Sequence, residues 1–408
     1  MKIVILTHYF PPEVGAPQAR LGDFARLWAA SGHDVHVVTG MPNHPTGIIP
    51  DQYRGRIRCD EHIDGYRVTR CWLYATPNEG IVKKTLGHLS FMASSLLLAF
   101  RRIGRPDVIV VSSPTFFAIG SAWLLALLKR SKLVVEVRDL WPAIFVELGV
   151  LTNRHAIRLL EALEMAAYRA ADAVVVVSEG FRDHITARGI PGNKVFTIRN
   201  GVDLERFVPS TTPNSKWRAE LDAGDKSLVL YIGAHGISQA LTTVIDAAAL
   251  ISDEQVHFAL VGDGADRERV LKHRDDLGLG NVTMRASVPR DEVSDVLASA
   301  DICLVTLRDI PLFTTFIPSK IFELMGSGKA IIAAVAGETA EILRAAGAIV
   351  VPPEDPSALA AAISELSTDA ARRHEMGVQG RRYVEQHFDR TALASRYEEI
   401  FEEIGAGI

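Results

Sequence analysis

The chain has 408 residues, of which 48% are hydrophobic and 23% are charged. These proportions are typical of a soluble globular protein of two or three domains, and they exclude a disordered chain, a collagen-like repeat and a bundle of membrane-spanning helices. The three cysteines, Cys59, Cys71 and Cys303, are scattered and form no CxxC pair. We therefore expect no disulfide framework and no cysteine-based zinc site, as in a protein of the reducing cytosol.

Charge is distributed unevenly along the chain. Residues 1–200 carry 24 Lys and Arg against 17 Asp and Glu, a net charge of +7, whereas residues 201–408 carry 20 against 32, a net charge of −12. The basic half could face an anionic partner or a membrane surface, or it could be dispersed, solvated charge. The most apolar stretches, 91–100 and 116–128, are shorter than the roughly 18–20 residues that cross a bilayer.

The N-terminal apolar run is also short and is predicted to be a strand, so we expect no signal peptide. We expect a cytoplasmic protein that at most associates peripherally with the inner face of the cell membrane.

Strand-like and helix-like segments alternate through the first half of the sequence. Continuous β-branched and apolar runs predict strands at 2–9, 34–40, 107–114, 132–139, 172–179 and 194–200. Apolar residues at helical spacing predict helices at 17–31, 116–128 and 154–171.

The alternation then starts again. Strands are predicted at 227–233, 257–264, 281–286, 301–307 and 329–335. Helices are predicted at 242–251, 267–277, 291–298 and 320–325. Strands that alternate with helices form parallel sheets, so we predict the α/β class with two Rossmann-like domains that face each other across a cleft.

The pattern is interrupted near residues 200–210, which predicts a domain boundary there. We assign 1–200 to an N-terminal domain, 201–385 to a C-terminal domain and 386–408 to a C-terminal helix. That helix could pack on either domain, and we place it on the first. Ligands of open α/β sheets bind beyond the carboxyl ends of the strands, so we expect the site in the cleft.

Two glycine-containing loops follow predicted strands. Gly15 lies in HYFPPEVGAP, and Gly233 and Gly236 lie in YIGAHGISQ. Glycine lets backbone approach a phosphate, and a following helix offers free N–H groups. An ordinary loop accounts for each pattern taken alone, and His235 between the glycines could be a solvated histidine. Neither GxGxxG nor a P-loop is present, which argues against dinucleotide and P-loop sites.

The segment IPSKIFELMGSGK at 317–329 begins with helix-starting residues, including Ser319. Lys320 and Glu323 are three residues apart and so share one helix face. A lysine there can hold a diphosphate, and a glutamate can accept two hydrogen bonds from a ribose diol. The alternative is a surface ion pair that contributes roughly a few tenths of a kcal/mol.

Several motifs occur in a characteristic order: FPPEVG at 10–15, RNGVD at 199–203, the glycine loop at 233–236, VGDG at 261–264, ASADICLVTL at 298–307 and PSKIFELMGSGKAIIA at 318–333. Together they resemble the retaining GT-B glycosyltransferases of family 4, over nearly the whole chain. HYFPPEVGAPQARL, EVRDLWP and GAHGISQAL resemble a bacterial subset of surface polysaccharide assembly that includes N-acetyl-fucosamine transferases.

The resemblance implies that the domain at 1–200 binds the acceptor and that the domain at 201–385 binds the nucleotide sugar. It also implies roles for single residues. Glu323 would bind the ribose of the donor, Gly15 would lie against its diphosphate, and Lys320 would lie near that diphosphate. Arg138 and Asp139, in EVRDLWP, would be catalytic-cleft groups. The loop that contains Ser287 and Val288 would help to frame the base.

The sequence also departs from the family pattern. Thr315 stands where the family has the first glutamate of its pair, and Ala234 and Gln239 stand where it commonly has a diphosphate-binding arginine and lysine. Four residues could supply the missing positive charge: His235, Arg199, Arg308 or Lys320.

The implied reaction is the retaining transfer of a hexose derivative, an N-acetylated deoxyhexosamine or hexosamine, from a UDP-linked donor to a lipid-linked saccharide. No metal or other cofactor is expected. A GT-B epimerase or hydrolase and a non-catalytic two-domain binding protein remain alternatives. A pI near 6.2 without a nucleic-acid-binding motif argues against nucleic acid as a partner.

Overall fold

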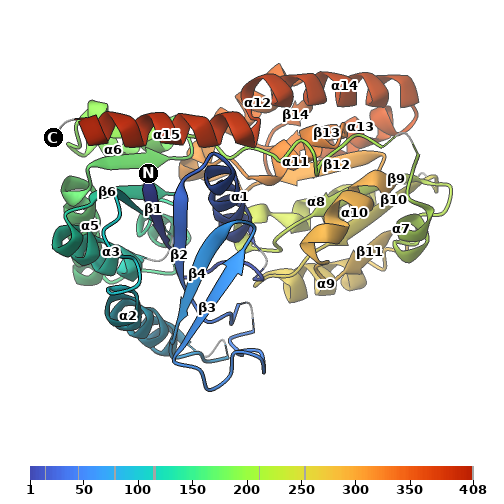
Figure 1. Ribbon diagram of the computed structural model, residues 1–408. Coiled ribbons are helices and arrows are strands. Elements are labelled where there is room, and N and C mark those ends of the chain that lie inside the picture. The colour runs from blue at the N-terminus through green and yellow to red at the C-terminus, as the bar shows by residue number, and fades with distance from the viewer. Residues whose placement is uncertain are drawn as a thin grey trace. The chain divides into compact units, whose positions relative to one another are not determined.

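The computed structural model describes residues 1–13, 15–44, 46–77, 80–113, 116–210, 212–251 and 254–406. The chain divides into two compact units, Met1–Arg199 together with Thr391–Ile408, and Asn200–Arg390 (Figure 1). The sequence placed these changes after residues 200 and 385, and the structure has them after 199 and 390.

The first unit is built on an eight-stranded sheet in the order β3-β4-β2-β1-β5-β6-β7-β8. Every strand pair in it is parallel except β3 with β4. The strands are β1 (Lys2–Leu6), β2 (Asp34–Gly40), β3 (Arg58–Ile63), β4 (Tyr66–Cys71), β5 (Val108–Ser112), β6 (Lys132–Val137), β7 (Ala173–Val176) and β8 (Val195–Thr197).

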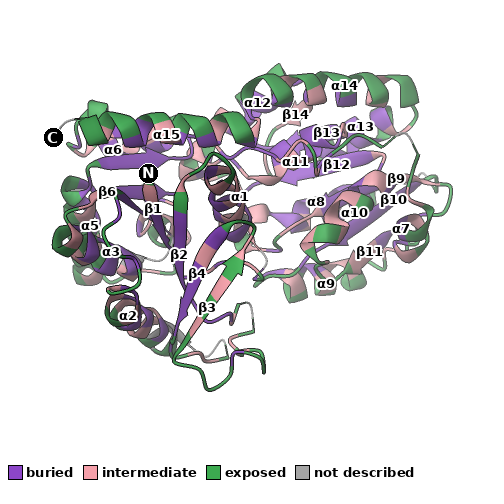
Figure 2. Ribbon diagram, viewed as in Figure 1, coloured by how far each residue is buried: buried purple, intermediate pink, exposed green. Residues whose placement is uncertain are grey.

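Helices cover this sheet, with their exposed sides turned to solvent (Figure 2). They are α1 (Ala16–Ala30), α2 (Gly80–Ala99), α3 (Phe116–Lys129), α4 (Ala143–Glu147), α5 (Arg154–Ala170), α6 (Glu179–Ala187) and α15 (Arg390–Ala406). The C-terminal helix α15 packs on this unit, where Phe24 and Trp28 of α1 contact Tyr397.

The second unit has a six-stranded, fully parallel sheet in the order β11-β10-β9-β12-β13-β14. Its strands are β9 (Ser227–Ile232), β10 (Val256–Val261), β11 (Val282–Arg285), β12 (Ile302–Thr306), β13 (Ala330–Ala334) and β14 (Ile349–Val351). Its helices are α7 (Ser215–Glu220), α8 (Leu241–Leu250), α9 (Arg267–Asp276), α10 (Val293–Ser299), α11 (Lys320–Gly326), α12 (Gly337–Ala345), α13 (Pro356–Ser367) and α14 (Ala370–His387).

The antiparallel β3–β4 pair was missed by the sequence analysis, and the first strand was predicted too long. The β3 segment RCDEHI alternates exposed and half-buried residues at the sheet edge, so it lacks the continuous apolar run of the other strands. Residues 7–9, predicted as strand, lie beyond the end of β1 at Leu6.

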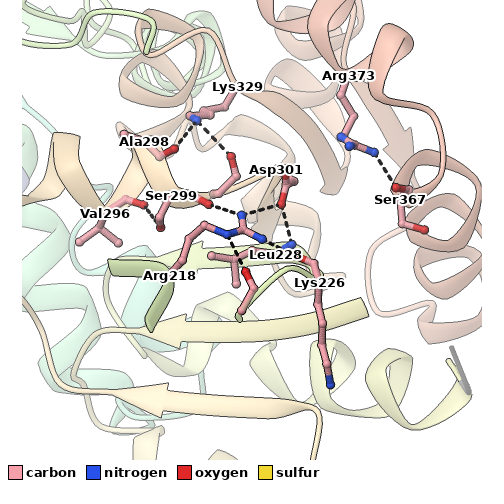
Figure 3. Close-up of polar contacts among 12 residues, drawn as sticks. Arg218, Lys226, Leu228, Val296, Ala298, Ser299, Asp301, Lys329, Ser367 and Arg373 are labelled. Atoms are coloured by element: carbon pink, nitrogen blue, oxygen red, sulfur yellow. Dashed lines mark hydrogen bonds and ion pairs between the residues drawn. The ribbon is translucent and has the colours of Figure 1, made fainter. Parts of the chain in front are cut away.

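Basic side chains stabilise the amino-terminal edge of the second sheet (Figure 3). Arg218 donates to the carbonyls of Gly224 and Ser299 and to Asp301. Lys329 donates to the carbonyls of Ala298 and Ala300, just past the end of α10. A cation at a helix C-terminus satisfies carbonyls that have no partner within the helix. These side chains therefore have a structural role.

A buried polar network holds the first unit together. The Glu136 carboxylate, fully buried on β6, accepts hydrogen bonds from Arg20 at 3.2 Å, from Tyr397 at 2.6 Å and from Ser112 at 2.9 Å. Burial alone would raise the pKa of Glu136, but these donors, with the Arg20 and Arg138 charges, hold it below its usual value. Arg20 also donates to the carbonyls of residues 198 and 199.

Replacing Glu136 should destabilise this unit strongly. Glu136→Ala leaves the Arg20 guanidinium buried without its counter-charge, which costs about 3–5 kcal/mol of unfolding free energy. The measurement is urea denaturation followed by circular dichroism. The matched control is Asp51→Ala, which removes an exposed partner of Arg54 and should change stability by about 0.5 kcal/mol or less. A loss below about 1 kcal/mol for Glu136→Ala would contradict the assigned role.

Candidate functional site

The carboxyl edge of the second sheet carries most of the predicted site residues. The strand order reverses between β9 and β12, because β10 and β11 extend to one side of β9 and β13 and β14 to the other side of β12. In open α/β sheets, ligands bind outside the carboxyl ends of the strands at such a reversal. Gly233 follows β9 directly at this point.

Two loops pack backbone against backbone at this edge. Gly233 has a φ of +137°, and a Cβ atom on Gly262 would lie 1.8 Å from the Gly233 carbonyl oxygen. A Cβ on Gly264 would lie 2.4 Å from the carbonyl oxygen of His235. Gly236 is less constrained, since its nearest neighbour, Ser238 Oγ, would be 3.7 Å away. Three of these four glycines are therefore needed by the packing itself.

His235 is fully buried between the two loops. Its backbone N–H donates to the carbonyl of Asp263 at 2.8 Å, and its carbonyl accepts from Asp266 N–H at 2.9 Å. Within the described part of the chain, neither ring nitrogen has a hydrogen-bond partner. Burial, followed by the charges of Lys320 and Arg267, lowers the pKa of His235 to about 4. The imidazole is therefore neutral at physiological pH.

Lys320 points its amine at the same loop. The Nζ atom is covered, lies 3.6 Å from the centroid of the Tyr231 ring, and has no hydrogen-bond acceptor among the described residues. A Cβ on Gly233 would come within 2.9 Å of it. Burial lowers the pKa of Lys320 to about 7, although Glu323 acts to raise it. The face of an aromatic ring favours the protonated form. This amine can therefore change its charge near neutral pH.

Ala234 and Gln239 stand at the positions where the resemblance implies an arginine and a lysine. Both contact the Tyr231 hydroxyl instead. The Tyr231 hydroxyl lies 2.7 Å from the Ala234 carbonyl and 3.1 Å from Gln239 Oε1. Thr315 donates its hydroxyl to the Leu312 carbonyl at 2.7 Å. Ala234, Gln239 and Thr315 are all uncharged, so these three departures from the family pattern place no charge at the carboxyl edge of the second sheet.

The helix α11 presents Lys320 and Glu323 together. Its apolar residues Ile321, Phe322, Leu324 and Met325 are buried, whereas Lys320 and Glu323 are half-buried. Ser319 precedes the helix and caps it with no side-chain hydrogen bond. The predicted shared face of Lys320 and Glu323 is thus present.

Ser287 is fixed to the glycine loops through Asp263. The Asp263 carboxylate accepts from the Ser287 backbone N–H at 2.7 Å and from its hydroxyl at 2.8 Å. Val288 packs against the apolar core. Asp263 also lies 3.4 Å from Arg267, the first residue of α9. Sequence reasoning missed Tyr231, Asp263 and Arg267, although Tyr231 begins the motif YIGAHGISQ and Asp263 lies within VGDG.

Four predicted residues belong to the first unit. Gly15 precedes α1, and a Cβ there would lie 2.4 Å from Oε1 of the buried Gln18. Arg199 holds its guanidinium 4.0 Å from Glu179.

Arg138 and Asp139 adjoin at the carboxyl end of β6. The buried Arg138 donates its backbone N–H to Ser113 Oγ at 3.0 Å. Burial raises the pKa of Asp139, and the Arg138 charge opposes this.

Glu13, in the FPPEVG motif, was not predicted as a site residue. Its buried carboxylate accepts from the backbone N–H groups of Phe10, Asn43 and His44, at 3.0, 2.8 and 2.8 Å. It therefore joins the loops that follow β1 and β2.

Family models match both units. Residues 15–201 match the glycosyl transferase 4-like domain, and residues 226–369 match the glycosyl transferases group 1 domain. The chain is 28% identical over 410 residues to WcaI of Escherichia coli, named as a colanic acid biosynthesis glycosyl transferase, with 97% of this chain and 98% of that protein covered. It is 28% identical over 267 residues to WbjE of Pseudomonas aeruginosa, named as a glycosyltransferase, with 64% of each covered.

Solved structures share the fold. Sucrose-phosphate synthase of Thermosynechococcus elongatus aligns with a TM-score of 0.77 at 21% identity and covers all of both chains. HepE of Anabaena, in complex with UDP and glucose, aligns with a TM-score of 0.73 at 20% identity over 98% of this chain and 99% of that one. The predicted α/β class with two Rossmann-like domains is confirmed. The chain therefore belongs to the GT-B glycosyltransferases, with a family 4-like domain followed by a group 1 domain.

Proposed function

We propose that this glycosyltransferase moves a hexose derivative, with retention of configuration, from a nucleotide-diphosphate sugar to a growing cell-surface polysaccharide. The observation that carries the proposal is the covered, unpartnered Lys320 amine at the strand-order reversal of the second sheet, where a diphosphate would meet it. Relatives support the pathway class, since one is named for colanic acid and another, from Bacillus subtilis, for teichuronic acid biosynthesis.

The proposed donor is UDP-linked and its sugar an N-acetylated deoxyhexosamine or hexosamine. The complexes of HepE with UDP and with UDP-glucose support the nucleotide, and the motif resemblance supports the sugar. The proposed acceptor is a lipid-linked saccharide. Mycobacterial relatives named as phosphatidylinositol monomannoside mannosyltransferases support an acceptor of this class.

Lys320 is the best candidate for the missing diphosphate-binding cation. Arg308 lies 3.6 Å from Glu354, Arg199 lies near Glu179, and His235 is neutral above pH 5 or so because its pKa is about 4. Of these four groups, the Lys320 amine alone is both covered without an acceptor among the described residues and able to carry a positive charge near neutral pH. A diphosphate beside it would favour the protonated amine, which would then stabilise the charge that develops on the leaving group.

In the proposed reaction, the acceptor hydroxyl attacks the donor's anomeric carbon on the face from which the diphosphate departs. Asp139 would accept a hydrogen bond from that hydroxyl and take its proton as the new bond forms, and Arg138 would keep Asp139 ionised beforehand. Glu323 would bind the ribose diol, and the chain's own cation would make a metal unnecessary.

An exposed apolar face of the first unit supports peripheral membrane docking. Trp123 and Leu127 on α3 are 48% and 61% exposed, and Leu159 and Leu163 on α5, which packs against α3, are 61% and 44% exposed. Lys129, Arg130, Arg154 and Arg158 belong to or adjoin the same helices. Apolar side chains with basic neighbours fit an anionic lipid surface. The described helices include none long and apolar enough to cross a bilayer.

The first test is calorimetric titration of UDP, GDP and ADP, with and without EDTA. We expect one nucleotide to bind in both conditions. Glu323→Ala should weaken it about 10–100-fold, because a charged acceptor of two hydrogen bonds is lost. Glu365→Ala, an exposed glutamate of the same unit, serves as the control and should leave the affinity unchanged. Equal affinity in Glu323→Ala would contradict the ribose assignment, and turnover of the donor without acceptor would favour an epimerase or hydrolase.

Donor binding should also depend on pH through Lys320. Above its pKa of about 7 the amine is neutral, so binding must take up a proton, and the Kd should rise up to about tenfold per pH unit between about pH 7 and 9. In this range the terminal phosphate of the nucleotide, with a pKa near 6, and His235 do not titrate. Calorimetry in buffers of different ionisation enthalpy measures the uptake directly. Lys320→Met should bind weakly with no slope, and a slope unchanged in that variant would refute the role of Lys320.

Vesicle sedimentation tests the membrane face. The protein should bind phosphatidylglycerol vesicles more than phosphatidylcholine vesicles, and salt should weaken the binding. Leu127→Glu combined with Leu159→Glu should abolish it, whereas Leu250→Glu, an exposed leucine of the second unit, should not. Binding that survives the double substitution would contradict this surface.

A further inference from the structure

Asp139 lines a small cavity in the first unit. The cavity has room of about 10 Å³, and its lining includes the polar residues Ser113 after β5, Glu164 and Tyr168 on α5, and Asp139 and Trp141 after β6. A water molecule needs about 10–15 Å³ and two to four polar partners. The cavity therefore has the size and the chemistry for one water.

Hydrogen bonds within the protein orient the polar groups around the cavity. Glu164, 2% exposed, accepts from the Tyr168 hydroxyl at 2.9 Å and from Arg188 Nη1 at 2.6 Å. The Tyr168 hydroxyl thus donates its proton to Glu164, and its oxygen can still accept a hydrogen bond from another donor. Ser113 accepts the Arg138 backbone N–H and can still donate its own hydroxyl proton.

We propose that one water bound in this cavity links Asp139 to Glu164, and that Glu164 is a positioning residue for Asp139. The water accepts from the Ser113 hydroxyl and donates to the Asp139 carboxylate and to the Tyr168–Glu164 pair. It fixes the direction of the Asp139 carboxylate, and it connects that carboxylate to Glu164, which lines the same cavity. The role of Asp139 in transfer rests on the proposed function, but the water site does not.

The charges that face this site come from several elements. Arg138 adjoins Asp139 and lowers its pKa, whereas burial raises it. On the Glu164 side, burial raises the pKa of Glu164, and Arg188, which follows α6, and the Tyr168 hydroxyl oppose this. Glu161, on α5 like Glu164, raises the pKa further. Removing the Glu164 charge would leave Asp139 with cations and one fewer anion nearby, so Asp139 would lose its proton at lower pH.

Carboxyl ¹³C NMR of aspartate-labelled protein tests this without any substrate. The Asp139 signal is assigned by its loss in Asp139→Asn. In Glu164→Gln, which keeps a side chain of the same shape, the Asp139 midpoint should fall by about half a pH unit or more. In the control Glu161→Gln, one turn away on α5 and outside the cavity lining, it should change far less. An equal midpoint in Glu164→Gln and the wild type would overturn the proposal.

The rate of glycosyl transfer from the donor proposed above gives a second readout. Glu164→Gln should lower kcat and move the acidic limb of the pH profile to lower pH, with the donor KM unchanged, and a high-resolution crystal structure should contain the water. A kcat loss with no movement of the limb would show a structural role only and would refute positioning. If no nucleotide binds, the proposed function fails, whereas the NMR result still decides the water site.

Discussion

The first unit depends on one buried carboxylate that several elements share. Glu136 on β6 binds Arg20 of α1, Ser112 at the end of β5 and Tyr397 of α15. Arg20 extends this network, because it also donates hydrogen bonds to the carbonyls of residues 198 and 199, where the chain leaves the unit. An isolated carboxylate in this position would be strongly destabilising, and the satisfied network makes the arrangement specific. Arg138 and Asp139 lie directly after this strand, which ends at Val137, so the network also fixes the position of these two proposed catalytic residues.

In the second unit the governing constraint is close backbone packing rather than charge. The contact between the Gly233 and Gly262 loops brings bare peptide groups to the carboxyl edge, next to the Lys320 amine and the His235 ring. Desolvation lowers the pKa of His235 to about 4 and that of Lys320 to about 7, so near neutral pH the imidazole is neutral and the amine is only partly protonated. A site of this kind carries little charge when unliganded and gains positive charge when an anion arrives, which limits the cost of holding an unpaired cation in a buried place.

Much of this architecture was predictable because parallel strands covered on both faces appear as apolar runs. The motifs also located the glycine loops and the Lys320–Glu323 face. The β3–β4 pair was not predictable in this way, since an edge strand such as RCDEHI has no such run. The sequence left four candidates for the missing cation, and only three-dimensional contacts separate them: Arg308 and Arg199 lie beside acids, and His235 is buried. Similarly, nothing in the sequence relates Glu164 to Asp139, which lies 25 positions earlier and meets it only across a cavity.

The place of α15 has a consequence for synthesis of the protein on the ribosome. Strand β6 and helix α1 are made early, but the Tyr397 hydroxyl that completes the Glu136 network, and the Ala394 carbonyl that accepts from Trp28, are made after the whole second unit. Domains generally fold in the order in which they emerge. Here the second unit can finish folding first, while the first waits with Phe24 and Trp28 uncovered. During that interval the nascent chain exposes an aromatic surface, which its last helix covers once it has been released.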